Sequence, residues 1–216
     1  MPTDRFMKNI LIADDHSLIR SGLRMVLDGM AVATTIHEAS DAKTVMATMK
    51  EKPFDLVLLD IQMPSTDPVV LMHWIRSFYP STKILIVSQN PEHIFGKRYL
   101  LLGADGFISK TAPDNEMIKA VTRVLNGDKY ISEQLSQTML QTMLNGAGAN
   151  PFDQLSQREF QVVICLAQGY ALNDICEMLQ VQYSTAHTHK RRAFEKLNVE
   201  DNKDLTKLAC AFDLVS

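Results

Sequence analysis

Polar side chains suited to binding a metal ion and a phosphate stand at the ends of four strand-like runs: Asp14 with Asp15, Asp60, Ser88 and Lys110. Apolar runs separated by helix-length segments are typical of parallel strands that are buried on both faces. In such sheets the ligand site lies beyond the carboxyl ends of the strands. The sequence therefore predicts one small pocket that gathers three carboxylates, a hydroxyl and an ammonium.

The types of these side chains point to phosphoryl transfer. Crowded carboxylates need a compensating charge, and their hard oxygens suit Mg²⁺, which keeps several waters and accepts a phosphate oxygen. A hydroxyl and a lysine would hold the other phosphate oxygens, and an aspartate can itself be the nucleophile that forms an acyl phosphate. A single aspartate after a strand often only caps the next helix, whereas the whole ordered set favours a phosphate site.

The segments that must position these residues alternate between strand and helix patterns. This alternation argues for a doubly wound α/β domain, here with five parallel strands. Strands are expected near 8–13, 34–39, 55–60, 82–88 and 104–109, and helices near 17–29, 41–51, 68–78, 92–102 and 113–126.

Four motifs follow one another along this region. They are Ile12-Ala13-Asp14-Asp15-His16, Leu59-Asp60-Ile61-Gln62-Met63-Pro64, Val87-Ser88 and Gly103-Ala104-Asp105-Gly106-Phe107-Ile108-Ser109-Lys110. In this order they resemble the receiver domain of two-component response regulators, which has a flavodoxin-like fold. The resemblance covers residues 8 to about 128.

The resemblance implies a role for each residue of the pocket. Asp60 would take a phosphoryl group from a cognate histidine kinase, and the protein would be a switch and not an enzyme. Phosphorylation would draw in Ser88, admit Phe107 to the space it leaves, and change the surface used for dimerisation or for release of the C-terminal domain. The expected residues are Asp14, Asp15, Asp60 and the main chain of Gln62 for Mg²⁺, Ser88 and Phe107 for the switch, and Lys110 for the phosphate.

The loop after Met63-Pro64 departs from the family pattern, because Pro68 stands where glycine is usual. Proline fixes φ at about −65° and has no N–H to donate, so this position cannot take a positive-φ turn. It can begin a helix, and Asp67 just before it would cap that helix. We therefore expect phosphorylation to survive with an unusual rate or lifetime.

Residues 129–150 are expected to link the receiver domain, 1–128, to a second domain, 151–216. Apolar residues recur at helical spacing from Ser132 to Leu144, which predicts a further helix. The run of glycine and small residues at 145–151 is typical of a flexible joint.

The last 66 positions, 151–216, have the pattern of a small all-α domain. Ser156 and Glu159 carry the signature of a capping box at the start of a helix that Gly169 ends. A short helix at 173–179, a turn and a longer basic helix at 184–197 outline a helix-turn-helix.

The basic helix divides into two faces. Ala186, His189, Ala193 and Leu197 recur at spacings of three and four, which predicts that they pack inward. The opposite face would read base edges, and the cations beside it would bind phosphates. The residues expected to contact DNA are Ser184, His187, Thr188, Lys190, Arg191, Arg192 and Lys196.

A second resemblance rests on Leu155-Ser156-Gln157-Arg158-Glu159, Gly169, Ile175, Leu179, Thr185-Ala186-His187-Thr188-His189 and Lys196-Leu197. These residues resemble the LuxR-type DNA-binding domain, which with the receiver makes a NarL/FixJ-like regulator. The resemblance implies binding to promoter DNA as a homodimer paired through the final helix, 201–211. RNA polymerase is a further candidate partner. His187 and Asn198 depart from the family, which often has lysine and glycine at these positions.

The charge of the C-terminal domain argues against simple DNA binding. Residues 151–216 hold seven Lys or Arg and nine Asp or Glu, a formal charge of −2. DNA affinity usually comes from cations at phosphates, and here the positive charge is confined to 184–198, with a net +3. We therefore expect weak binding by a monomer and usable affinity when two copies engage together.

Two other functions stay open. The helical domain could bind a protein partner in place of DNA, which the missing lysine at His187 favours. A phosphatase that uses Asp60 as nucleophile is the other alternative, although the sequence offers no obvious cap to cover a substrate.

Composition limits the remaining classes. The chain has 216 residues and a net charge of −3, with no apolar stretch near the roughly 18 residues of a membrane span and no secretory signal at its polar start. We expect a cytoplasmic protein of one or two domains without a membrane partner.

Cys165, Cys176 and Cys210 lie on apolar faces without metal-ligand spacing, so they are expected to be buried free thiols. No histidine is expected to bind a metal.

Overall fold

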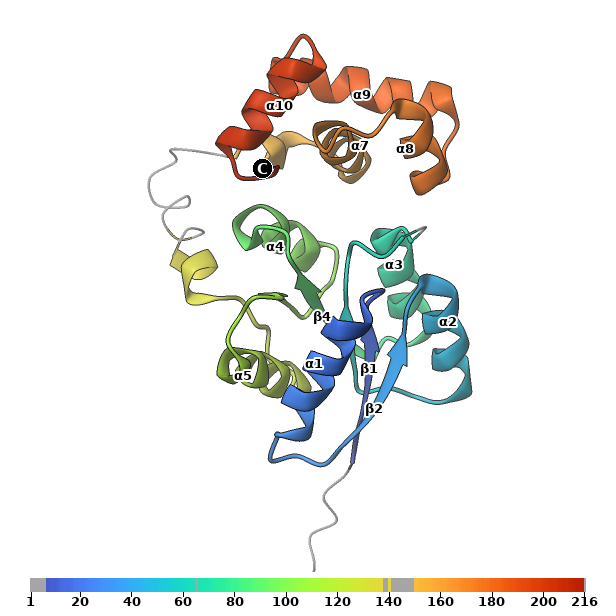
Figure 1. The fold of residues 1–216 in the computed structure, drawn as a ribbon, viewed down its shortest axis with the longest axis vertical. Coiled ribbons are helices and arrows are strands. Elements are labelled where there is room, and N and C mark those ends of the chain that lie inside the picture. Colours follow the sequence, from blue (N-terminus) through green and yellow to red (C-terminus); the bar gives the residue numbers. More distant parts are fainter. Residues whose placement is uncertain (1–6, 65, 138–139, 141–149, 216) are drawn as a thin grey trace, which may run out of the picture. The chain divides into compact units, whose positions relative to one another are not determined.

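The computed structural model describes residues 7–64, 66–137, 140 and 150–215. The chain forms two compact units, Met1–Ser136 and Gln137–Ser216 (Figure 1). The first unit combines strands and helices, and the described part of the second is helical. The finer boundaries at 128 and 151 stay a prediction.

Five parallel strands form the sheet of the first unit, in the order β2-β1-β3-β4-β5. Strands and helices alternate along the chain, which confirms the doubly wound fold. The elements are β1 (Lys8–Ala13), α1 (Ser17–Asp28), β2 (Thr34–Ala39), α2 (Ala42–Glu51), β3 (Leu56–Leu59), α3 (Pro68–Phe78), β4 (Lys83–Ser88), α4 (Glu92–Leu101), β5 (Gly106–Ser109) and α5 (Asp114–Leu125).

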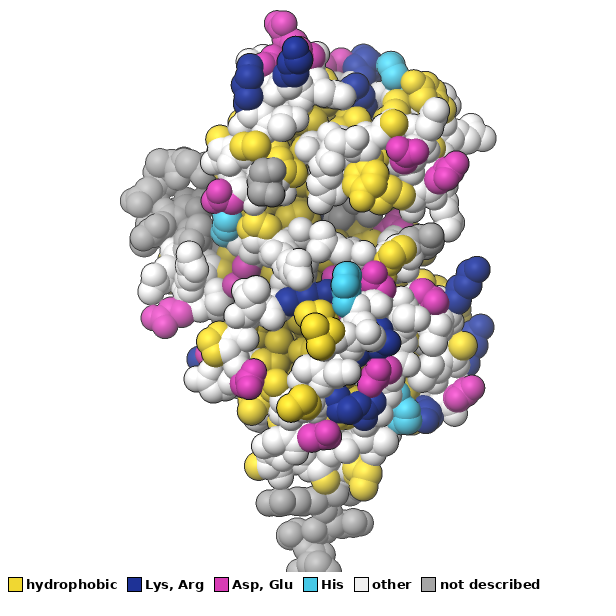
Figure 2. All heavy atoms as spheres, viewed as in Figure 1, with side chains coloured by type: hydrophobic (Ala, Val, Ile, Leu, Met, Phe, Trp, Pro, Cys, Tyr) yellow, Lys and Arg dark blue, Asp and Glu magenta, His cyan; other side chains and the backbone are white. Residues whose placement is uncertain are grey.

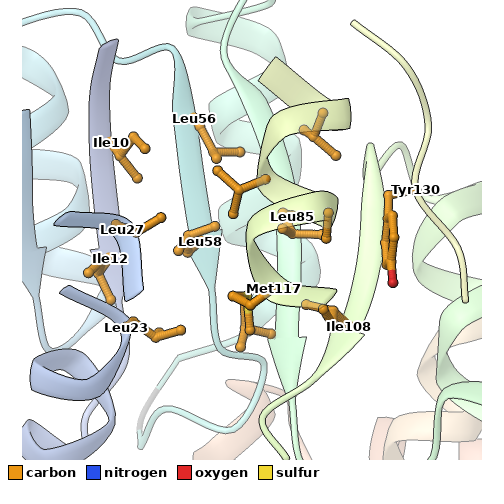
Figure 3. Packing of buried hydrophobic residues seen from close by; sticks show 14 residues of the cluster. Ile10, Ile12, Leu23, Leu27, Leu56, Leu58, Leu85, Ile108, Met117 and Tyr130 are labelled. Atoms are coloured by element: carbon orange, nitrogen blue, oxygen red, sulfur yellow. The ribbon is translucent and has the colours of Figure 1, made fainter. Parts of the chain in front are cut away.

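Both faces of the sheet are covered, because successive side chains of a strand point to opposite sides. On one face, residues of β1, β3, β4 and β5 pack against Leu23 and Leu27 of α1 and Val121 of α5 (Figure 3). On the other, Phe107 of β5 lies beside Tyr99 of α4, with 6.5 Å between ring centroids. Burial on both sides explains why these strands appear in the sequence as unbroken apolar runs.

Helix α3 begins at Pro68, as predicted from the unusual proline. The side chain of Asp67 accepts hydrogen bonds from the main-chain nitrogens of Val69 and Val70, at 3.0 and 3.4 Å. Proline suits the first helical position because the N–H that it lacks would be unpaired there.

The segment after α5 packs back onto the sheet. The main chain of Tyr130 donates to the carbonyl of Asp105 at 2.9 Å and accepts from the N–H of Phe107 at 3.3 Å, so it lies alongside β5. Residues 133–137 are helical and bury Leu135. The predicted helix at 132–144 is thus confirmed over 133–137; its positions 138–139 and 141–144, and the predicted joint through 149, lie outside the described residues.

The second unit has the predicted helices. They are a 3₁₀ turn, η1 (Pro151–Gln154), and α7 (Gln157–Ala167), α8 (Leu172–Leu179), α9 (Tyr183–Leu197) and α10 (Asn202–Ala211). Ser156 and Glu159 form the predicted capping box. Asn198 ends α9 with φ 53°, a left-handed conformation that asparagine tolerates better than most residues and that explains the family's glycine at this position.

The cysteines are free thiols, but their predicted burial is only partly right. Cys165 is buried and Cys176 is half-buried, whereas Cys210 is exposed on α10. Position 210 lies on the outer side of the helix, one residue after the fully buried Ala209. Among the described residues, none of the helices is long and apolar enough to cross a bilayer.

Candidate functional site

The predicted pocket forms at the carboxyl edge of the sheet. Asp14 and Asp15 follow β1, Asp60 follows β3, and Lys110 follows β5. Main-chain hydrogen bonds between neighbouring strands continue into these positions: the N–H of Asp60 donates to Ala13 at 2.8 Å, and that of Lys110 to Ser88 at 2.9 Å. The parallel register therefore brings Lys110 into one site with Asp60, which lies 50 positions earlier in the sequence, and with Asp14, which lies 96 positions earlier.

Lys110 joins two of the three carboxylates. Its ammonium nitrogen lies 2.8 Å from Asp60 Oδ2 and 2.6 Å from Asp14 Oδ2. All three side chains are at most 3% exposed, whereas that of Asp15 is 25% exposed at the rim. The other oxygen of Asp60 accepts from the main-chain N–H of Gln62 at 3.0 Å.

Burial and charge act in opposite directions on the pKa values of this site. Burial raises the pKa of Asp60 above its usual range, although the bonded ammonium of Lys110 opposes this shift. Burial alone would lower the pKa of Lys110, but its bonds with Asp14 and Asp60 raise it. Lys110 is therefore fully charged at neutral pH, and the buried carboxylate of Asp60 is more basic than one in water.

The residues of this pocket fit a divalent cation. Asp14, Asp15, His16 and Asp60 each offer a ligand atom, and these atoms all lie within 4.8 Å of one another. Three carboxylates face one ammonium, and the ring nitrogen Nδ1 of His16 lies 2.8 Å from Asp15 Oδ1. Oxygen donors with an excess of negative charge are what Mg²⁺ requires.

Ser88 ends β4 and Phe107 lies in β5, three residues before Lys110, and both are fully buried. The hydroxyl of Ser88 accepts from the main-chain N–H of Asn90 at 3.1 Å. The ring of Phe107 is already buried in this structure. The predicted movement from an exposed to a buried position therefore has no exposed starting point here. The pairing of the two residues as a switch stays a prediction.

The second predicted site lies on α9. Ala186, Ala193 and Leu197 are buried, as predicted, and His189 is half-buried. The seven predicted DNA contacts are all exposed or half-buried; they are Ser184, His187, Thr188, Lys190, Arg191, Arg192 and Lys196.

Several cations of this helix already have partners. Lys196 lies 2.6 Å from the buried carboxylate of Glu159 on α7, and Arg191 lies 3.0 Å from Glu195 one turn away. Lys190 lies over the ring of Phe194, 5.0 Å from its centroid. Acidic and basic side chains are interspersed over this unit on the face shown in Figure 2. The two ion pairs reduce the charge that the helix offers to a polyanion.

Three residues of the two sites were missed by reasoning from the sequence. His16 joins the carboxylate cluster, Tyr183 begins α9 and lies stacked on His187 with 6.4 Å between ring centroids, and Phe194 packs under Lys190. Phe194 lies eight residues after Ala186 and three before Leu197, spacings that an apolar helical stripe includes, so this pattern held a signal for it. The motif Asp14-Asp15-His16 held a signal for His16, since histidine is a common metal ligand.

Comparison with known families decides the identity of both units. The model of the response regulator receiver domain matches residues 10–122, just over half of the chain. The chain belongs to the response regulators. Residues 153–209 match the luxR family of bacterial regulatory proteins, which confirms the two-part architecture and the predicted helix-turn-helix.

Individual relatives of this response regulator match it along nearly its whole length. The oxygen regulatory protein NreC of Staphylococcus carnosus is 32% identical over 93% of this chain and 95% of its own. Response regulator GacA of Pseudomonas protegens is 30% identical over 97% and 98%, and UvrY of Escherichia coli 29% over 94% of both chains. RcsB of Salmonella typhimurium has the same fold, with a TM-score of 0.79 at 22% identity over 95% of this chain and 98% of its own.

Proposed function

We propose that this response regulator accepts a phosphoryl group on Asp60 from a cognate histidine kinase and thereby controls binding of its luxR-family domain to promoter DNA. The observation that carries the proposal is the bonding of one buried ammonium, Lys110, to both Asp60 and Asp14 at the sheet edge. The ammonium of Lys110 thus lies beside the carboxylate that would be phosphorylated, where it can bind the oxygens of an incoming phosphoryl group.

Each residue of the pocket has a part in this proposal. Asp60 Oδ2 attacks the phosphorus of the kinase's phosphohistidine, the P–N bond breaks as the histidine leaves, and the ammonium of Lys110 moves from the carboxylate to an oxygen of the transferred phosphoryl group. Mg²⁺ held by Asp14, Asp15, Asp60 and the main chain of Gln62 would neutralise charge as the group arrives. The hydroxyl of Ser88 would supply a further hydrogen bond to the phosphoryl group, and Phe107, which like Ser88 is fully buried, would be the second residue of the switch.

Promoter binding is supported by the luxR-family match and by the exposed outer face of α9. RcsB, which shares the fold, has been solved on promoter DNA with the phosphate mimic BeF₃⁻. Because the net charge of 151–216 is −2, we propose that two copies act together, so that the cations of both α9 helices contribute to binding. A location in the cytoplasm and contact with RNA polymerase belong to the same proposal.

Phosphorylation can be tested directly. Full-length protein is incubated with Mg²⁺ and a small-molecule phosphodonor, and its intact mass is measured. Wild type should gain one phosphoryl group that hydroxylamine removes, and Asp60→Asn should gain none. The exposed Asp128 provides the control, because Asp128→Asn should behave like wild type. Labelling of Asp60→Asn to the wild-type extent would refute the proposal.

The second function to consider is binding of a protein by the helical unit. It is favoured by the ion pairs that occupy Lys196 and Arg191 and by the acidic net charge. Selection of genomic DNA fragments by wild type with Mg²⁺ and beryllofluoride, compared with Asp60→Ala, separates the two. A shared site enriched by wild type alone, with affinity that falls steeply with salt, supports DNA binding. Lack of enrichment by either protein supports the protein partner.

A further inference from the structure

An exposed tyrosine stands at the end of α9 that a helix-turn-helix inserts into DNA. Recognition helices contact base edges through their N-terminal residues. Tyr183 is the first residue of α9 and was not among the residues predicted to contact DNA. The residue is 56% exposed, so more than half of its surface takes no part in packing the helical unit.

The ring of Tyr183 lies against His187, one helical turn further along. The ring centroids are 6.4 Å apart, and the two ring planes differ by 26°. Aromatic rings attract one another in offset stacks with centroids about 4.5–7 Å apart. His187 is itself exposed, so the stack limits the motion of the tyrosine ring without removing it from solvent. The first turn of α9 therefore presents a pair of aromatic rings on its outer face.

Two of the residues predicted to read bases already bond within their own helix. The hydroxyl of Thr188 donates to the carbonyl of Ser184 at 2.8 Å, and Arg191 forms its ion pair with Glu195. Residues 183–189 hold no Lys, Arg, Asp or Glu, so ion pairs with phosphates begin further along the helix. The aromatic pair is thus the large exposed feature of the neutral end of α9.

We propose that Tyr183 determines sequence specificity by packing its ring against the C5-methyl group of a thymine in the major groove, with His187 holding the ring in position. The inference rests on the proposed promoter binding. Of the four bases only thymine offers a methyl group in this groove, and apolar side chains read thymine through it. A neutral ring releases no counterions, so it changes the preference among sequences and not the salt dependence.

The test uses a DNA fragment that the full-length protein selects from genomic DNA with Mg²⁺ and beryllofluoride. Each thymine is replaced in turn by deoxyuridine, which lacks only the methyl group. Wild type should bind about fourfold more weakly at one position of each half-site, as expected for one lost methyl contact. Tyr183→Ala and Tyr183→Gln, both better helix formers than tyrosine, should lose this sensitivity and keep the wild-type slope of log K against log salt.

Two matched variants control for the ring and for the position. Tyr183→Phe keeps the ring and should keep the sensitivity to the methyl group. Tyr170, which follows α7 in the same unit, is 45% exposed, and Tyr170→Ala should also respond to deoxyuridine as wild type does. Hydrogen exchange of the α9 amides should be the same in all these variants.

The outcomes separate this inference from the proposed function. If wild type tolerates every replacement, or if Tyr183→Ala and Tyr183→Gln stay sensitive at the same thymine, the role of Tyr183 is wrong and promoter binding stands. If wild type selects no fragment at all, promoter binding and the inference fall together.

Discussion

Gly96 in α4 lies directly against the buried side chain of Leu135, from the segment that follows α5. A methyl group at Gly96 would lie 2.8 Å from Leu135 Cδ2 and 3.1 Å from Glu92 Cγ. It would also lie 3.8 Å from Cβ of Phe107, and Glu92 accepts the N–H of Ser132 at 3.0 Å. The absence of a side chain at Gly96 therefore lets the chain beyond the receiver helices pack beside a predicted switch residue.

Gly96→Ala is expected to lower the free energy of unfolding of the first unit by about 1 kcal/mol, because the gain in helix propensity is outweighed by overpacking against Leu135. The control is Gly22→Ala in α1, where a methyl group has open space and should stabilise by about 0.5–1 kcal/mol. Urea unfolding followed by the single tryptophan, Trp74, measures both. If Leu135→Ala failed to relieve the cost of Gly96→Ala in a double-mutant cycle, the contact would not be its cause.

The ion pair of Asp105 with Arg76 should make the first unit sensitive to acid. Asp105 is 7% exposed, and its Oδ2 lies 2.5 Å from Arg76 Nη2 and 2.9 Å from the main-chain nitrogen of Ile84. Burial alone would raise the pKa of Asp105, but the bonds from Ile84 and Arg76 hold it below its ordinary value of 3.8. Because the pKa is lowered on folding, the stabilisation is present above pH 3.8 and is lost as pH falls below it.

Arg76→Met should therefore cost about 2–3 kcal/mol at neutral pH, because a buried carboxylate loses a partner. Lys83 and Lys129, which lie 3.9 and 3.4 Å from the other oxygen of Asp105, keep the cost below that of a fully isolated charge. The difference from wild type should shrink below pH 3.8. Asp105→Asn is the control, since the free energy of unfolding of this variant should lose the pH dependence that the carboxylate of Asp105 causes. An unchanged pH profile would contradict the assignment of this dependence to Asp105.

The sequence was sufficient to predict the strands, because burial on both faces leaves an unbroken apolar run. It was also sufficient to predict where α3 begins, because Pro68 and Asp67 act locally. It was also sufficient for the residues at the ends of the strands, since a parallel sheet must bring these together. Contacts that depend on packing between distant segments were not readable. Tyr130 lies alongside β5 without any periodic pattern, and the direction of the His16 ring depends on a loop.

Lys196 shows a different limit of the sequence. Its place beside the outward face of α9 predicted a phosphate contact, and this stays a prediction. The structure pairs it with Glu159, 37 positions earlier, and its main-chain carbonyl accepts from Gln154 at 2.6 Å. A cation on a helix surface has several partners within reach, and only the fold determines which one is closest.

Glu159→Gln is expected to destabilise the second unit by roughly 1–2 kcal/mol at neutral pH, since the capping box and the bond to Lys196 both weaken. Burial alone would raise the pKa of Glu159, but its bonds with Lys196 and Ser156 hold it below 4.5. The wild-type advantage should thus disappear as pH falls below 4.5. Hydrogen exchange of α7 and α9 amides in the full-length protein measures the effect. Unchanged protection of both helices at neutral pH would argue against it.

His187→Lys is expected to strengthen DNA binding, because it restores a cation on the exposed face of α9. One further phosphate contact should steepen the dependence of log K on log salt by about 0.9 and raise affinity severalfold at low salt. The charge-matched control is His73→Lys on α3, which should leave the slope unchanged. Fluorescence anisotropy over a salt series, with a fragment recovered by genomic selection, provides the measurement. Equal slopes for the two variants would place residue 187 away from the DNA.

Tyr130 also has a consequence for the solubility of the first unit. β5 is an outer strand of the sheet, and an outer strand with free N–H and carbonyl groups can recruit another chain and aggregate. The main chain of Tyr130 occupies the N–H of Phe107 and the carbonyl of Asp105, which shields this edge. A chain cut at 128 would lose this cover and expose the strand, so a receiver produced by itself should extend at least through Leu135 to remain monodisperse.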